Sequence, residues 1–308
     1  MKIGYFADGP WSHQALERIN LKNQFEIVFI VPRYETQDPI LKKWAEEKNI
    51  DFLVLKDVNS NDNIDLLNSY DADLFVSMSF NQIIKKKLLT IAPKGFINCH
   101  AGALPFYRGR NILNWVLIND EKHFGVTIHY IDEGIDTGDI ILQKKYEISD
   151  NDDYKSLLDR SYKYCAELLL ESLNLINEGN LEVIKQNEIN TNGSYYKKRN
   201  IGDEIINWNS SSRQIFNFIR AISHPGPCAR TYINNIEYMI EKAVEQNIDN
   251  KSLENIIYHV PGTIVEVEDN QIKVKTANSF ILITKFRSVE KSHYKIKIND
   301  KFSNKVEI

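Results

Sequence analysis

The sequence predicts an α/β protein: a Rossmann-like, mostly parallel sheet with helices on both faces, followed by a small, β-rich, open-barrel-like subdomain. Apolar runs alternate with amphipathic stretches over the first half of the chain, which is typical of βαβ units and a parallel sheet. These runs are continuous rather than alternating, as expected for strands covered on both faces. The β-rich subdomain is predicted because short strands, in which apolar and polar side chains alternate, dominate after residue 230.

The strands and helices of the first part follow one another in a regular order. Strands are expected at residues 2–6, 25–31, 51–55, 73–79, 95–100, 126–131 and 141–148. Helices are expected near residues 11–22, 38–49, 60–69, 110–119 and 153–178. The last helix carries an apolar stripe at helical spacing and ends at Gly179. Together these elements predict one α/β domain over residues 1–190.

Residues 191–308 are expected to form a linker helix and the β-rich subdomain. The helix is predicted near residues 211–222, and it is broken by the His-Pro-Gly-Pro run that begins at His224. Farther along the chain, the runs GTIVEVE and QIKVKT are joined by Asp269 and Asn270. The turn-forming pair and the alternating side chains on both arms predict a β-hairpin.

Composition and charge narrow the class of protein. The chain has 308 residues, of which 43% are hydrophobic and 26% charged, as is ordinary for a globular protein. Its formal net charge of −4 gives no support to nucleic-acid binding, which relies on a basic face. Three scattered cysteines indicate neither a disulfide framework nor a zinc site, so no metal is expected. Because no apolar run reaches transmembrane length and the N-terminus lacks a signal-peptide core, we expect a cytoplasmic protein without a membrane partner.

The most unusual segment runs from residue 96 to residue 140. Asn98 and His100 stand two residues apart at the end of an expected strand, so both side chains point to the same face. In open α/β sheets, ligands bind beyond the carboxyl ends of the strands. The glycine-punctuated loop 132–139 follows another strand and offers several carboxylates, among them Asp136. Spacing alone leaves a structural histidine and a plain acidic turn open as alternatives.

This segment resembles the formyltransferase family that uses formyl-tetrahydrofolate. The family pattern is N-x-H, a loop ending in L-P, an aromatic-R-G, then G-V-T before a G-x-D-T-G-D loop. The matching residues here are Asn98-Cys99-His100, Leu104-Pro105, Tyr107-Arg108-Gly109, Gly125-Val126-Thr127 and Gly134-Ile135-Asp136-Thr137-Gly138-Asp139. A match this dense over a long, ordered segment is far more specific than one short motif. The resemblance extends to both ends of the chain and includes the β-rich C-terminal subdomain.

The resemblance implies that a formyl group moves from N10-formyltetrahydrofolate, a co-substrate, to an amine through a tetrahedral intermediate. Asn98 would donate a hydrogen bond to the oxyanion of that intermediate. His100 would accept a proton from the attacking amine or help to stabilise the oxyanion, a division that the sequence leaves open. Asp136 would set the tautomer and orientation of the imidazole, and it is also a candidate to relay the proton to the leaving nitrogen.

The resemblance also implies that backbone groups of two stretches hold the pterin ring of the folate. The first stretch supplies Ser79, Phe80, Asn81, Ile83 and Ile84, and the second supplies Asp132, Glu133, Gly134 and Ile135. Recognition through the backbone leaves a weak side-chain signature, so this expectation rests on the family pattern alone.

Three acceptors occur in the family: the amino acid on initiator tRNA, a nucleotide-linked aminosugar, and glycinamide ribonucleotide. The last type resembles a catalytic domain alone, which this chain exceeds. For the tRNA enzyme, the resemblance implies a basic insert after the second strand, but the segment here is short and sets Glu35 and Asp38 beside Arg33. A proline common in the tRNA enzymes after the aromatic-R-G motif is replaced by Arg110-Asn111. We therefore expect no nucleic-acid partner.

Several short runs resemble sugar N-formyltransferases instead, among them residues 6–13, 111–115 and 195–199. A nucleotide sugar needs cations for its phosphates, and an aromatic ring can stack on its base. Contacts with the nucleotide sugar are expected from Trp11, Tyr107, Arg108, Lys198, Arg199 and Trp208. For Trp208, plain core packing is the alternative.

The sequence thus predicts an enzyme that formylates the C3 or C4 amine of an amino-dideoxyhexose on a dTDP or UDP carrier, for a surface polysaccharide such as a lipopolysaccharide O-antigen. Two alternatives stay open: methionyl-tRNA formyltransferase and a non-catalytic folate-binding protein. The complete set of Asn98, His100 and Asp136 argues against the second. Relatives in the family are often dimers, so the resemblance also suggests a homodimer.

Overall fold

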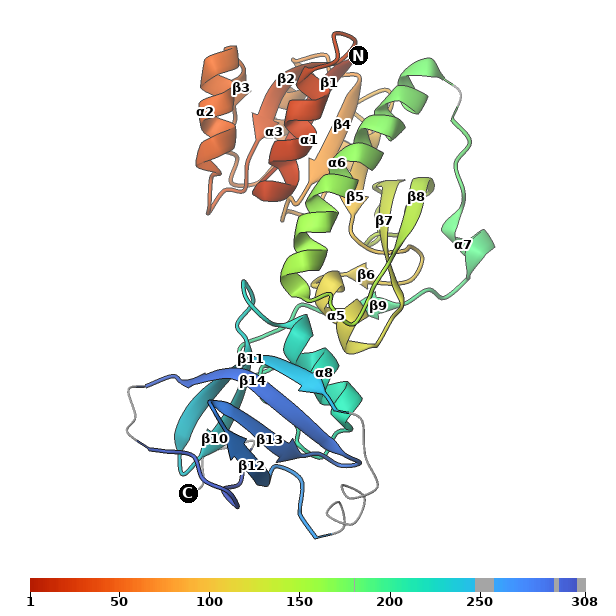
Figure 1. Ribbon diagram of the computed structural model, residues 1–308. Helices are drawn as coiled ribbons and strands as arrows, with labels where there is room; N and C mark the ends of the chain where they lie inside the picture. Colours follow the sequence, from red (N-terminus) through yellow and green to blue (C-terminus); the bar gives the residue numbers. More distant parts are fainter. Residues whose placement is uncertain (180, 247–257, 291–293, 304–308) are drawn as a thin grey trace. The chain divides into compact units, whose positions relative to one another are not determined.

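A computed structural model describes residues 1–179, 181–246, 258–290 and 294–303. The chain divides into two compact units (Figure 1), each treated by itself below. Unit 1 comprises residues 1–112, 123–147 and 158–197, and unit 2 comprises residues 113–122, 148–157 and 198–308. Two short segments from the first half of the chain therefore join the C-terminal residues in unit 2.

Unit 1 is built on a seven-stranded sheet in the order β3-β2-β1-β4-β5-β7-β8. Its strands are β1 (Lys2–Ala7), β2 (Glu26–Val31), β3 (Asp51–Phe52), β4 (Leu74–Met78), β5 (Phe96–His100), β7 (His123–Tyr130) and β8 (Ile140–Glu147). The pairs from β3 to β5 are parallel, whereas β5, β7 and β8 pair antiparallel. The predicted fold class, a mostly parallel sheet with helices, is confirmed.

Helices cover both faces of this sheet. Tyr5 and Phe6 are neighbours on β1, so their side chains point to opposite faces. The Tyr5 hydroxyl donates to the Ser12 carbonyl in α1 (Pro10–Asn20), which places α1 on one face. Phe6 belongs to a buried aromatic cluster on the other face, where side chains of α3 (Asn61–Asn68) and α4 (Lys86–Leu89) also pack.

Unit 1 also contains a long helix beside α1 and two shorter helices. The long helix α6 (Tyr154–Glu178) lies beside α1 (Figure 1), and Trp11 of α1 packs edge-on against Tyr162 of α6 at 4.9 Å. The other two are α2 (Pro39–Lys48) and α7 (Gln186–Ile189). A short parallel ribbon, β6 (Arg108–Gly109) with β9 (Tyr195–Tyr196), was absent from the sequence prediction.

The strand order reverses between β1 and β4, because β1 pairs with β2 on one side and with β4 on the other. The carboxyl ends of strands at such a reversal are the usual ligand sites of open α/β sheets. β5 lies next to β4, and it ends in the motif that contains Asn98 and His100. The fold therefore places the predicted catalytic residues at this edge.

Unit 2 contains a five-stranded antiparallel sheet in the order β10-β11-β14-β13-β12. The strands are β10 (Ala229–Ile233), β11 (Ile236–Glu245), β12 (Ile264–Glu268), β13 (Gln271–Lys275) and β14 (Phe280–Ser288). The hairpin predicted at Asp269-Asn270 is present, and both turn residues have positive φ, as a tight hairpin turn requires. Two helices belong to this unit, α5 (Ile112–Ile118) and α8 (Ser212–Ala221). The first residue of α5, Ile112, is assigned to unit 1.

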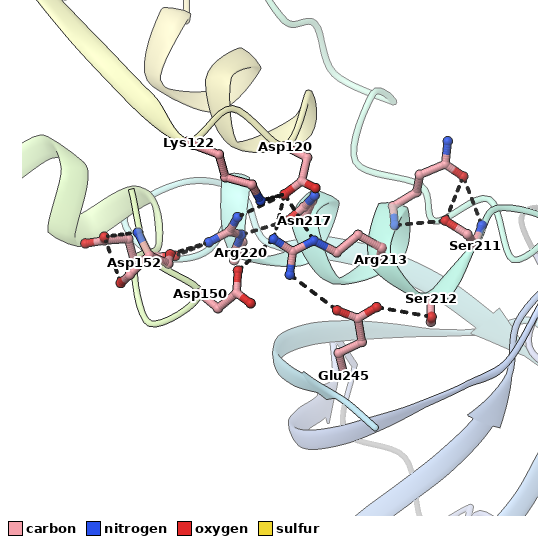
Figure 2. A network of polar contacts seen from close by, with 12 residues as sticks. Asp120, Lys122, Asp150, Asp152, Ser211, Ser212, Arg213, Asn217, Arg220 and Glu245 are labelled. Atoms are coloured by element: carbon pink, nitrogen blue, oxygen red, sulfur yellow. Dashed lines mark hydrogen bonds and ion pairs between the residues drawn. The ribbon is translucent and has the colours of Figure 1, made fainter. Parts of the chain in front are cut away.

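A charged network joins the three segments of unit 2 (Figure 2). Arg213 of α8 donates to Asp120 at 2.6 and 3.0 Å, to Asp150 at 2.6 Å and to Glu245 at 3.3 Å. These carboxylates come from residues 113–122, 148–157 and β11. One guanidinium thus holds together parts of the unit that are far apart in the sequence.

Candidate active site

The pairing of β5 with β7 assembles the centre of the site. In this antiparallel pair, Asn98 stands opposite His129 and His100 stands opposite Thr127. Opposed residues of an antiparallel pair send their side chains to the same face of the sheet. His129 therefore joins the two residues of the N-x-H motif on one face.

His129 is neutral and orients Asn98. Its Nδ1 atom lies 2.7 Å from the carbonyl oxygen of Tyr130, which can only accept, so Nδ1 carries the hydrogen. The Nε2 atom then accepts a hydrogen bond from the Asn98 amide nitrogen at 3.2 Å. Burial disfavours the charged imidazole and lowers the pKa of His129 to about 4 despite the nearby Asp136 carboxylate. Because the Asn98 amide nitrogen carries two hydrogens, one remains to donate to a developing negative oxygen.

The tautomer of His100 is fixed by a backbone carbonyl. Its Nε2 atom donates to the carbonyl oxygen of Tyr107 at 2.7 Å, which leaves Nδ1 as the nitrogen that can accept a proton. Nδ1 faces the Asp136 carboxylate at 3.7 Å. The expectation that Asp136 sets this tautomer was therefore wrong: Tyr107 sets it, and Asp136 faces the nitrogen that becomes charged. A Cβ on Gly102 would lie 2.5 Å from Nε2 and 2.7 Å from the Tyr107 oxygen, so this bond needs a glycine there.

Asp136 lies between the two histidines. One carboxylate oxygen is 3.7 Å from His100 and accepts a hydrogen bond from the backbone N–H of Gly109 at 2.9 Å, and the other oxygen is 3.6 Å from His129. Burial raises the pKa of this carboxyl, but His100, His129, the Gly109 N–H and Arg108 together lower it below its ordinary 3.8. The carboxylate is therefore charged at neutral pH.

The first stretch expected to hold the pterin leads into α4, where Lys86 Nζ lies 3.9 Å from a carboxylate oxygen of Glu133 in the second stretch. Ile83 and Ile135 are 74% and 60% exposed, which leaves apolar surface for a flat ring to cover. Arg33 fixes the first stretch, because its guanidinium donates to the carbonyl oxygen of Ser79 at 2.5 and 2.8 Å. Phe80 is half-buried against the aromatic cluster, Asn81 is exposed, and Ile84 is buried.

The second stretch is an internally bonded turn. The Asp132 carboxylate accepts from the Gly134 N–H at 3.0 Å and from the Thr137 hydroxyl at 2.5 Å. Its side chain is therefore engaged in shaping the loop that presents Glu133 and Ile135 to solvent. Such a turn offers backbone groups, as the family pattern implies for the pterin.

Three residues expected to contact the nucleotide sugar lie in unit 1. Trp11 is half-buried against α6. Tyr107 is 8% exposed, and its ring stacks on Tyr196 at 4.7 Å. Arg108 is 6% exposed, and its guanidinium is directed into the protein, where it donates to Gln186 and to the Tyr195 hydroxyl. Arg108 is thus engaged within the chain.

The other three lie in unit 2. Lys198 is exposed. The Arg199 guanidinium lies over the rings of Trp115 and Phe218 at 5.7 and 5.5 Å. Trp208 is 4% exposed, stacks on Phe302 at 5.2 Å and donates its indole N–H to Thr231 at 2.9 Å. For Trp208 the structure therefore supports the alternative, core packing, and corrects the expectation of a stacking contact with a base.

Two residues of the site were missed from the sequence. His129 stands two residues after Thr127 on a strand, and this spacing could have placed it on the face of the motif once the β5–β7 pairing was assumed. Gln186 lies in a short segment without periodicity, so no sequence pattern pointed to it. Among the described residues no group of three or more His, Cys, Asp or Glu could hold a metal ion.

The arrangement can perform acyl transfer to an amine. It offers a partly buried amide donor on Asn98, a proton acceptor on His100 and a charged carboxylate on Asp136 that stabilises the protonated imidazole. Comparison with known proteins agrees with this chemistry: the formyl transferase family matches residues 1–173, and the C-terminal domain of formyl transferases matches residues 200–301.

This chain belongs to the formyltransferase family. Among curated relatives, the methionyl-tRNA formyltransferase of Clostridioides difficile (strain 630) is 34% identical over 251 residues, covering 82% of this chain and 78% of that protein. The methionyl-tRNA formyltransferase of Fusobacterium nucleatum is 32% identical over 294 residues, covering 92% of this chain and 91% of that protein.

Solved structures similar to this formyltransferase include enzymes that act on sugars. WlaRD, a sugar 3N-formyl transferase crystallised with dTDP and 5-N-formyl-THF, has a TM-score of 0.70 and 27% identity, covering 95% of this chain and 99% of that chain. The N-formyltransferase of Helicobacter canadensis, in complex with folinic acid and dTDP-3-aminofucose, has a TM-score of 0.69 and 25% identity, covering 93% and 100%. No helix in the described part of this formyltransferase is long and apolar enough to cross a membrane.

Proposed function

We propose that this formyltransferase moves the formyl group of N10-formyltetrahydrofolate to the amine of a nucleotide-linked amino-dideoxyhexose. The carrier is dTDP or UDP, the amine is at C3 or C4, and the product enters the cytoplasmic synthesis of a surface polysaccharide. Both sugar N-formyltransferase structures reported above match nearly the whole of this chain from end to end, C-terminal unit included.

The observation that favours a nucleotide sugar over tRNA as the acceptor is that cations of unit 2 form ion pairs with carboxylates of the same unit. A tRNA-binding face needs cations that are free to meet phosphates. Here Arg213 binds three carboxylates, Lys285 and Arg287 both bind Glu241, and Arg230 binds Glu237. These cations are committed to carboxylates within unit 2, which favours a small acceptor over an RNA.

The loop after β2 supports the same choice. In a tRNA enzyme this position would offer a basic insert, but here the cation of the loop, Arg33, donates to Ser79 and lies 3.6 Å from the Asp8 carboxylate. Thr36 of the same loop donates to Asp8 at 3.3 Å. The loop is thus folded onto the edge of its own sheet and gives little positive charge to a nucleic acid.

The proposed roles follow from the geometry of unit 1. The acceptor amine attacks the formyl carbon, and its proton passes to Nδ1 of His100, the nitrogen left unprotonated by the bond to Tyr107. The remaining N–H of Asn98 donates to the oxygen as it becomes negative, a contribution of roughly 3–4 kcal/mol for such donors. Asp136 stabilises the imidazolium that forms, and the proton then returns to the leaving nitrogen of the folate.

Methionyl-tRNA formyltransferase remains the second candidate, because the two curated relatives with that name reported above are 34% and 32% identical over most of the chain. The two candidates share the catalytic centre and differ only in the acceptor. The identity to those relatives therefore supports the chemistry more strongly than it supports the acceptor.

A formyl-transfer assay decides between the acceptors. The purified protein is offered N10-formyltetrahydrofolate with a panel of dTDP- and UDP-linked 3-amino and 4-amino sugars, and in parallel with charged initiator tRNA. We expect turnover of one nucleotide sugar and none of the tRNA; turnover of the tRNA alone would overturn the proposed acceptor. The variant His100→Asn serves as the control for catalysis, and a wild type that binds folate but turns over no acceptor would favour a non-catalytic folate-binding protein.

A further inference from the structure

Gln186 is a buried glutamine that links two parts of the active-site region within unit 1, the loop that contains Asp136 and the side chain of Arg108. It is 3% exposed and lies at the start of α7, about fifty residues from the loop that contains Asp136. Its side-chain nitrogen donates to the backbone carbonyls of Asp136 and Gly138 at 2.9 and 2.8 Å. Its side-chain oxygen accepts from Arg108 at 3.1 and 2.7 Å. Every hydrogen of the amide nitrogen is therefore used, and the amide cannot be flipped without losing all of these bonds.

The Asp136 backbone needs such support. Its φ of 53° lies in the left-handed region, which costs a non-glycine residue about 1 kcal/mol or more unless the surroundings hold it. Gly138, two residues later, has no room for a Cβ against the carbonyl of Tyr130. The two N–H bonds from Gln186 hold the carbonyls on either side of this bend. They fix the direction in which the Asp136 side chain leaves the loop.

Arg108 is the other partner of Gln186. Its Nη1 atom donates to the Tyr195 hydroxyl at 3.0 Å, and its guanidinium carbon lies 5.0 Å from the centre of the Tyr195 ring. The positive charge of the guanidinium is one of the causes that lower the pKa of Asp136. A change at Gln186 would therefore alter both the backbone of Asp136 and the position of a positive charge near it.

We propose that Gln186 is a positioning residue for formyl transfer: it holds the Asp136 loop and the Arg108 guanidinium in one arrangement, so that the Asp136 carboxylate faces both His100 and His129. The hydrogen-bond partners of the Gln186 side chain are Arg108 and two backbone carbonyls, and none of these is a reacting group. Its effect on catalysis therefore passes through Asp136. The inference concerns the catalytic centre and is independent of the identity of the acceptor.

Two variants distinguish the bonds made by the amide oxygen of Gln186 from those made by its amide nitrogen. Gln186→Leu removes all four hydrogen bonds at nearly constant volume. Gln186→Glu keeps an oxygen for Arg108 but sets carboxylate oxygens against the carbonyls of Asp136 and Gly138. We expect kcat to fall roughly 10- to 100-fold in both, because a small misplacement of a group in the centre has effects of that size. In Gln186→Glu the added negative charge also offsets that of Arg108.

The decisive readout is the pKa of Asp136, measured by ¹³C NMR of its carboxyl group against pH in the full-length protein. The freed Arg108 guanidinium in Gln186→Leu and the added negative charge in Gln186→Glu should each raise this pKa, most in Gln186→Glu. Because the NMR titration needs no acceptor, it stands even if the proposed nucleotide sugar is wrong. Folding is checked by the amide spectrum of each variant.

Gln143→Leu is the matched control. Gln143 is also a partly buried glutamine of unit 1, and its amide donates to the Leu104 carbonyl and the Thr127 hydroxyl at 2.7 and 2.9 Å. We expect it to lower stability while the pKa of Asp136 stays at the wild-type value. If the Gln186 variants also lower only stability, with kcat and the pKa of Asp136 unchanged in the folded protein, Gln186 is structural and the proposal fails.

Discussion

The Nε2 atom of His129 lies 3.2 Å from the side-chain nitrogen of Asn98, directly across the β5–β7 pair. Because Nδ1 of the same ring is bonded to a backbone carbonyl, the ring is fixed and Nε2 can only accept. The Asn98 amide is therefore held with its nitrogen turned toward His129. A residue outside the N-x-H motif thus decides which atom of Asn98 can meet the substrate.

Replacing His129 should impair catalysis through Asn98. In His129→Leu the amide of Asn98 loses its acceptor and can rotate, so the donor is no longer preorganised. We expect kcat to fall roughly 10- to 100-fold with little change in folate affinity. The control is His123→Leu, an exposed histidine at the start of the same strand, which should retain wild-type kcat. Equal activity of the two variants would show that His129 does not orient Asn98.

His129 also predicts a loss of stability at low pH. Its pKa is about 4 in the folded protein against an ordinary 6.5, because burial disfavours the charged ring. As the pH falls below 6.5, His129 binds a proton in the unfolded chain but not in the folded protein. The free energy of unfolding therefore decreases until pH 4. At 1.36 kcal/mol per pH unit this amounts to about 3 kcal/mol. The lowered pKa of Asp136 acts only below its ordinary 3.8 and so lies outside this window.

Urea denaturation between pH 7 and pH 4 checks this expectation. His129→Gln removes the titrating ring, and other groups contribute equally to both proteins. The free energy of unfolding of the wild type should therefore fall relative to that of the variant as the pH decreases. A difference between the two proteins that is constant with pH would contradict the neutral, buried imidazole.

The sequence was informative where a pattern is local. Asn98 and His100 share a face because strand side chains alternate, and the fold class followed from the order of apolar runs. The position of His129 depends instead on the register between β5 and β7, which local periodicity does not encode. Trp208 shows the opposite case: an aromatic residue near a basic run suggested a ligand contact, but its ring fills the core against Phe302.

Which segments of the chain belong to unit 2 was equally hard to predict from the sequence. Residues 113–122 and 148–157 join it although they lie within the stretch predicted as one catalytic domain. Their attachment depends on Asp120 and Asp150 meeting Arg213, residues separated by 93 and 63 positions. Ion pairs between distant residues leave no periodic trace, so a sequence cannot reveal them without the fold.

Arg213 should therefore matter for the stability of unit 2. Arg213→Ala leaves Asp120, Asp150 and Glu245 without their shared partner, and we expect the free energy of unfolding to fall by about 1–3 kcal/mol. Amide hydrogen exchange of α8 measures the effect within the unit. The control is Lys122→Ala, because Lys122 also pairs with Asp120 but is 65% exposed, and it should change the exchange rates little. Equal effects would mean that the network contributes no more than a surface pair.

The charge of Asp136, rather than its hydrogen bond, should be what catalysis requires. Asp136→Asn keeps an oxygen that can accept from the Gly109 N–H but removes the negative charge 3.7 Å from His100. The imidazolium formed during transfer then loses its stabilising partner, so kcat should fall roughly 100- to 10,000-fold, as for His100→Asn. Because the two residues act as a unit, the double variant should be little worse than either single one. Asp139→Asn removes the same charge from the same loop and should stay near wild-type kcat; if the double variant instead shows the product of the two single effects, the two residues act independently.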